Sequence, residues 1–100
     1  MTGLPNLNYP AFHRAAARLR AQGHEVFSPA EENGKPIDPI EQPDENTWHE
    51  LVRRGIRLLL NCERLVLLPG WEESRGARVE LQIAITLNMT VIHYSEPARN

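Results

Sequence analysis

A run of four apolar residues at positions 65–68 lies between two segments whose apolar residues recur at helical spacing. So short and continuous a run is typical of a strand covered on both faces, as in a parallel sheet. The expected order over the whole chain is helix, strand, helix, strand, helix, strand. We therefore predict an α/β fold with a short parallel sheet and right-handed crossover connections.

Caps and apolar periodicity place the expected elements. The first helix is expected to follow Asn8, with Pro10 in its first turn. Thr47 is expected to open the second helix through a capping box with Glu50, and the third helix is expected at residues 75–88. The expected strands are short apolar segments between these helices: residues 24–27, 65–68 and 90–94.

Between the first strand and the second helix, residues 28–46 are rich in proline and include Gly34. Proline fixes φ and removes a backbone donor, so we expect neither helix nor strand there. A loop of this length in a compact domain is often a functional lid or a disordered flap. The chain is long enough for one domain, expected at residues 1–94, with a loose tail at 95–100.

Charge and composition exclude several classes of function. A net charge of −2, from 11 Lys+Arg and 13 Asp+Glu, gives no electrostatic case for binding duplex nucleic acid or an anionic membrane. The single cysteine, Cys62, rules out an internal disulfide and suits a reducing compartment, so a cytoplasmic location is expected. The histidines and Cys62 show no metal-ligand spacing, and no dinucleotide or phosphate-loop motif is present, so we expect no metal and no cofactor.

The sharpest functional signal is a glutamate on the apolar side of the third helix. At about 100° per residue, Arg78, Gln82 and Thr86 share one polar arc, whereas Glu80 projects from the apolar side. A carboxylate in apolar surroundings is costly unless it is paired or protonated. Such carboxylates cluster at functional sites, although a helix-edge position or a salt bridge explains the pattern equally well.

The turn that precedes this helix, residues 68–76, adds to the signal. Open parallel sheets bind ligands at the carboxyl ends of their strands. Ser74 can cap the helix and leave its first amides free for a phosphate or carboxylate, while Gly76 lets a ligand approach the backbone. An ordinary N-cap after a tight turn would explain the same residues, and Arg75 either assists an anion or is simply solvated.

The spacing of Ser74, Gly76, Glu80 and Ala84 resembles the signature of nucleoside 2-deoxyribosyltransferases and of deoxynucleoside monophosphate N-glycosidases. The chain is more similar still to a family of small phage and bacterial proteins of unknown function in that superfamily. That similarity covers three segments in order along the chain: residues 1–12, 23–31 and 68–80.

The resemblance implies a flavodoxin-like three-layer sandwich that hydrolyses or transfers the N-glycosidic bond of a nucleoside or nucleotide. It implies that Glu80 is the nucleophile at the anomeric carbon, as in a retaining glycosidase. Trp71 would stack on a base, unless it only packs. The residues expected to bind substrate flank the start of the third helix: Gly70, Trp71, Ser74, Arg75 and Gly76.

Two features depart from the family's pattern. Its enzymes carry a catalytic aspartate at the position of Gly55, on the inward face of the second helix, while Glu63, at another acidic position of the family, is expected to be structural. The family also has a strand ahead of the segment that begins this sequence, so the expected sheet lacks its first strand and exposes an edge that a partner chain would cover. A nucleotide-binding module without catalysis and a small interaction protein that forms a homo-oligomer therefore stay open as alternatives.

Overall fold

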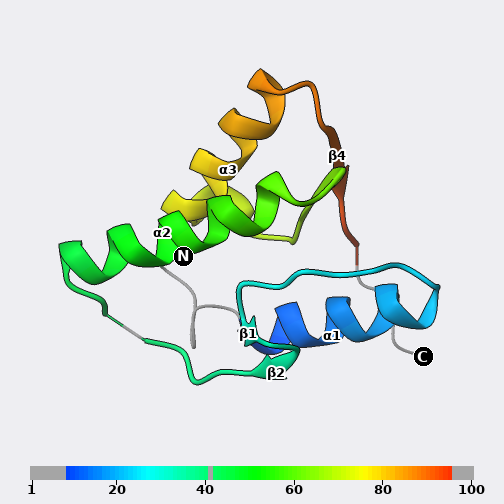
Figure 1. Cartoon of the computed structure of the whole chain (residues 1–100), viewed down its shortest axis with the longest axis horizontal. Helices are drawn as coiled ribbons and strands as arrows, with labels where there is room; N and C mark the ends of the chain where they lie inside the picture. The colour runs from blue at the N-terminus through cyan, green and yellow to red at the C-terminus, as the bar shows by residue number, and fades with distance from the viewer. Residues whose placement is uncertain (1–8, 41, 96–100) are drawn as a thin grey trace.

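The computed structural model describes residues 9–40 and 42–95 of the chain. This part of the chain contains three α-helices, a short 3₁₀ helix and four short strands (Figure 1). The helices are α1 (Tyr9–Ala21), α2 (Glu45–Leu60), η2 (Trp71–Glu73) and α3 (Arg75–Thr86). The strands are β1 (Glu31–Glu32), β2 (Lys35–Pro36), β3 (Arg64–Leu67) and β4 (Thr90–His93).

The strands form two separate pairs. β3 and β4 are parallel, in a register that aligns Arg64 with Thr90 and Leu67 with His93, and α3 connects them as a crossover helix. β1 and β2 form a small antiparallel hairpin. The predicted α/β class and the parallel pairing of the last two strands are therefore confirmed, while the described residues contain two small sheets rather than one sheet of three strands.

The predicted strand at residues 24–27 is wrong, because this segment is not paired with β3 in the structure. Its polar groups are engaged by α1 instead. The amide of His24 donates to the carbonyl of Leu19 (3.1 Å), and the carbonyl of Val26 accepts from the Arg20 guanidinium (2.9 Å).

The proline-rich loop contains the β1–β2 hairpin, so the expectation that it holds no strand is wrong for these residues. Asn33 and Gly34 both have positive φ, 53° and 78°, as in the tight turns that favour an Asn-Gly pair. Pro36 is tolerated because a two-stranded sheet consists only of edge strands. The Asn33-Gly34 pair was the sequence signal for this hairpin.

Helix α2 begins two residues earlier than predicted, and its cap differs. The side chain of Asp44, rather than Thr47, is the N-cap and accepts from the Thr47 amide (2.7 Å). Glu50 does not reach back to the cap but pairs with Arg53 (2.7 Å). The predicted capping box is therefore wrong, because an aspartate at the earlier position caps the same first turn.

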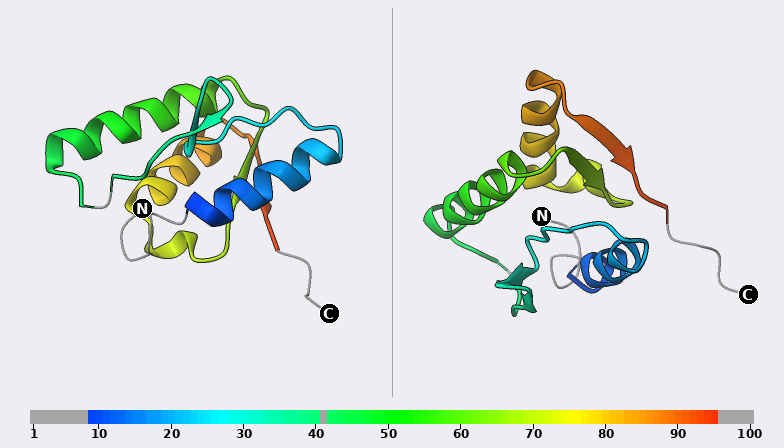
Figure 2. Two further views of the ribbon diagram at one scale, coloured as in Figure 1. Left: turned by 90° about the horizontal axis from the view of Figure 1, so that it is seen from below. Right: turned by 45° about the vertical axis from the view of Figure 1, so that its right-hand side comes forward.

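Helix α1 begins at Tyr9 with Pro10 in its first turn, as predicted, while the expected cap Asn8 lies outside the described residues. Tyr9 packs against Ala30 in a small apolar cluster that also includes Phe12 and Ile37. Helix α1 and the segment that follows it thus form one side of the molecule. Helices α2 and α3 with the β3–β4 pair form the other side (Figure 2).

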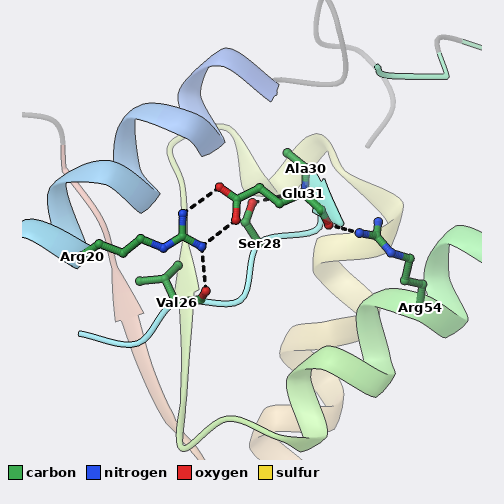
Figure 3. A network of polar contacts seen from close by, with 6 residues as sticks. All are labelled: Arg20, Val26, Ser28, Ala30, Glu31 and Arg54. Carbon is green, nitrogen blue, oxygen red and sulfur yellow. Dashed lines mark hydrogen bonds and ion pairs between the residues drawn. The ribbon is translucent and has the colours of Figure 1, made fainter. Parts of the chain in front are cut away.

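Two arginines connect these sides through the segment at residues 26–31 (Figure 3). Arg20 of α1 pairs with both carboxylate oxygens of Glu31, at 2.8 and 2.6 Å. Arg54 of α2 reaches the same segment from the opposite side and donates to the carbonyls of Pro29 (2.8 Å) and Glu31.

None of the helices in the described ranges is long and apolar enough to cross a lipid bilayer.

Candidate functional site

A cavity of about 560 Å³ lies between the two sides of the molecule. One wall is the continuous stretch of residues 61–71, which runs along β3 and into the turn after it. Residues 24–27 and the inward faces of α2 and α3 form the other walls, and most of the lining side chains are apolar. The carboxyl end of β3 therefore opens into a cavity large enough for a small organic ligand.

Glu80 lines this cavity from the second turn of α3. Its side chain is half-buried and lies directly against the backbone of α2 at Gly55. A Cβ placed on Gly55 would be 3.1 Å from Glu80 Oε2 and 3.7 Å from its Cδ. At this contact between the two helices, a carboxyl group meets a residue without a side chain.

Burial raises the pKa of Glu80 to about 7, against a smaller lowering by the positive charge of the chain's amino terminus. Within residues 9–40 and 42–95, no arginine, lysine or histidine forms an ion pair with this carboxyl. The cause of the raised pKa is desolvation, which disfavours the charged form. The Glu80 carboxyl therefore changes between its protonated and ionised forms near neutral pH, well above the ordinary range of a glutamate.

The turn between β3 and α3 is built by Gly70 and Ser74. Gly70 has a φ of 89°, a left-handed conformation that favours glycine, and it introduces the 3₁₀ turn of η2. Ser74 is buried, and its hydroxyl accepts from the amide of Ala77 (3.1 Å), which caps α3 as the sequence predicts. This turn places the first residues of α3 on the wall of the cavity that Glu80 also lines.

Five of the six predicted site residues line this one cavity: Gly70, Trp71, Ser74, Gly76 and Glu80. Trp71 packs against the His93 ring, with centroids 6.0 Å apart. Arg75 is turned the other way. Its guanidinium stacks 3.7 Å from the centroid of the Trp48 ring and pairs with Glu45 (3.1 Å).

A family described as a domain of unknown function, DUF4406, matches residues 1–93 of the chain. The chain belongs to the DUF4406 family. No curated protein and no solved structure matches it. Membership agrees with the predicted resemblance to a family of unknown function, and the wider relation of this DUF4406 chain to nucleoside 2-deoxyribosyltransferases stays a prediction.

The far end of the cavity in this DUF4406 domain is more polar. His24, Glu25, Glu63 and Arg64 all lie there, at the amino end of β3. Cys62 lines it too, and its thiol donates to the Leu58 carbonyl (3.2 Å). Burial raises the pKa of the Cys62 thiol, which keeps it neutral and argues against a role as nucleophile. The described residues contain no group of three or more His, Cys, Asp or Glu side chains that could hold a metal ion.

Two features of the site were not predicted. Residues 24–27 form a wall of the cavity, although the sequence pattern placed them inside the sheet. The stacking of Arg75 on Trp48 was also not predicted. The two residues lie on different helices, so the spacing of residues within one helix could not have indicated their contact. Gly55, in contrast, was visible in the sequence as a small residue on the inward face of α2, and the structure adds its contact with Glu80.

Proposed function

We propose that this DUF4406 domain hydrolyses or transfers the N-glycosidic bond of a nucleoside or nucleotide, with Glu80 as the nucleophile. The proposal is carried by one observation: a half-buried carboxyl with a raised pKa faces a cavity of about 560 Å³ at the carboxyl end of a parallel strand. The resemblance of Ser74, Gly76 and Glu80 to the deoxyribosyltransferase signature supports the choice of reaction.

In the proposed reaction the ionised Glu80 carboxylate attacks the anomeric carbon of the sugar. A carbon–oxygen bond forms as the carbon–nitrogen bond breaks, and the electron pair of that bond leaves with the base, which takes a proton from water. Attack by water, or by a second base, on the anomeric carbon then releases the sugar and restores the carboxylate. Because only the ionised form attacks, the rate should rise with pH through about 7.

The start of α3 would bind the other end of the substrate. Amides in the first turn of a helix have no partners within the helix and attract anions. Ser74 and Gly76 are both buried beside the cavity, so a 5′-hydroxyl or 5′-phosphate placed there would orient the sugar toward Glu80. Trp71, which lines the same cavity, would contact the base.

Incubation with deoxynucleoside monophosphates, followed by chromatography for the free base, tests the proposal. We expect Glu80→Ala to reduce base release by more than about 100-fold. Glu63→Gln is the matched control, because Glu63 is an exposed carboxylate at the other end of the same cavity. Base release that is equal in the wild type and in Glu80→Ala contradicts the role of Glu80.

Gly55 favours a second candidate, a module that binds nucleotides without turning them over. It brings no second carboxyl to Glu80, so no acid partner from α2 assists the departure of the base. Isothermal titration with the same nucleotides separates the two candidates. Heat of binding without base release supports the module, and the absence of both contradicts both.

The free edge of β3 favours a third candidate, an interaction protein that pairs with a second copy of itself. Within the described residues β3 pairs only with β4, and its residues line the cavity. Two parallel strands are fewer than a stable sheet needs, and such an edge pairs readily with another chain. Phe27 and Ile92, 44% and 37% exposed, add apolar surface at the same cavity.

Size-exclusion chromatography with light scattering tests this third candidate. We expect a dimer whose β3 amides are protected from hydrogen exchange, since paired strands exchange slowly. A twofold axis would bring the same edge of both copies together. A monomer whose β3 amides exchange rapidly contradicts it.

A further inference from the structure

We propose that Gly55 is a positioning residue for Glu80: the bare backbone of α2 at Gly55 is the surface against which the Glu80 carboxyl rests, and it fixes where that carboxyl faces the cavity. This inference rests on the proposed role of Glu80 and names the residue that would hold it in place. It predicts that a single methyl group on α2 displaces the carboxyl.

The geometry around Gly55 is specific to Glu80. Gly55 is buried in the third turn of α2. Apart from its own helix and chain neighbours, the only described atoms within 4 Å of a Cβ at this position are Oε2 and Cδ of Glu80. A separation of 3.1 Å is tighter than an ordinary contact, so the carboxyl would have to move by a few tenths of an ångström. Within residues 9–40 and 42–95, no other side chain competes for this space.

The backbone conformation does not explain a glycine here. Gly55 lies inside a regular helix and, unlike Gly23, Gly34 and Gly70, has no positive φ. A glycine within a helix is less favourable than alanine. The close approach of Glu80 is therefore the feature of the structure that requires the absence of a side chain, and the stability of α2 by itself would favour Gly55→Ala.

Among the described residues that line the cavity, few besides Glu80 are acidic or basic. The inward residues of α2 around Gly55 are apolar, and Arg54 points to the carbonyls of residues 29 and 31. From η2, Glu72 and Glu73 are exposed. The titratable groups at the other end of the cavity are His24, Glu25, Glu63 and Arg64. The positive charge of the amino terminus lowers the pKa of Glu80 by less than burial raises it. Desolvation thus governs this carboxyl, and a displaced carboxyl should gain water.

A carbon-13 NMR titration of the Glu80 carboxyl in the wild type and in Gly55→Ala tests the inference. We expect the pKa of Glu80 to fall by at least about half a unit in Gly55→Ala, because the carboxyl moves out of its contact with α2 into the more hydrated cavity. The melting temperature should stay equal or rise, as an alanine favours the helix. Arg57→Ala, on the exposed face of the same helix, is the control and should leave the titration unchanged.

Function gives a second readout. Base release by Gly55→Ala should fall at least tenfold, through kcat. The same Gly55→Ala change should cost less when it is made in the Glu80→Asp variant, because the shorter side chain avoids the methyl group. An unchanged Glu80 titration in a folded Gly55→Ala variant overturns the inference. So does a lowered melting temperature with no change in the titration, which would make Gly55 a packing residue only. If the wild type releases no base, the proposed function fails, and the titration still decides the role of Gly55.

Discussion

At the scale of single residues, Glu80 links the stability of the protein to pH. Its pKa is about 7 in the folded state and near 4.5 when unperturbed, so the folded protein retains a proton that the unfolded chain loses between these values. The stability that this retained proton contributes to the folded state is fully present below about pH 4.5 and is lost as the pH rises through about 7. Over the whole range, a rise in the pKa of Glu80 from 4.5 to about 7 corresponds to somewhat more than about 3 kcal/mol of unfolding free energy.

We therefore expect the free energy of unfolding to fall by about 2–3 kcal/mol between pH 5 and pH 8 because of Glu80. Glu80→Gln should remove most of this decrease and be more stable than the wild type at pH 8. Urea denaturation at the two pH values measures both effects, with Glu63→Gln as the control that keeps the wild-type slope. Equal pH dependence in the wild type and Glu80→Gln would show that the carboxyl is not desolvated.

The inward direction of Glu80 could be read from the sequence because helical periodicity is a local property. The contact of Glu80 with Gly55 could not be predicted from helical periodicity. Gly55 and Glu80 are on different helices, and only the packing of α2 against α3 brings the carboxyl against the glycine. For Arg75 the local pattern was misleading. Its place in the motif predicted a position in the cavity, but its guanidinium contacts Trp48 and Glu45 instead.

At the scale of elements, the segment between α1 and α2 is held by side chains more than by pairing of its backbone with a sheet. Arg54 of α2 donates to the Pro29 and Glu31 carbonyls, and Arg20 of α1 holds the Glu31 carboxylate. The same guanidinium keeps the pKa of Glu31 below its ordinary value through their hydrogen bond. This arrangement holds in place the segment whose residues 24–27 form a wall of the cavity.

Arg54→Met should detach this segment from α2, since methionine keeps much of the length and loses every donor. We expect a loss of about 1–3 kcal/mol in unfolding free energy, the cost of carbonyls left without their charged donor. Arg53→Met is the matched control on the exposed face of the same helix, where the ion pair with Glu50 is worth under about 0.5 kcal/mol. Urea denaturation compares the two variants, and limited proteolysis at residues 28–44 reports local release. Equal losses in both would contradict a connecting role for Arg54.

At the scale of the whole molecule, the two sides meet across a cavity rather than across a continuous core. In the described part of the chain, the buried apolar residues are four alanines, three leucines and one tyrosine, with Tyr9 and Ala30 on one side and Leu67 and Ala84 on the other. The expected single sheet would have filled this space with backbone. Residues 24–27 instead do not pair with β3, so a pocket lies between them and, within the described residues, β3 has one unpaired edge.

The sequence by itself determined the α/β class, the three helices, the parallel pairing of β3 with β4 and the cap of α3, because apolar periodicity and capping act within a few residues. It also indicated which face of α3 carries Glu80. Only the tertiary structure decided that residues 24–27 do not pair with β3 and that Glu80 lies on Gly55. Those outcomes depend on contacts between residues distant in the chain, where burial and steric fit override local preference.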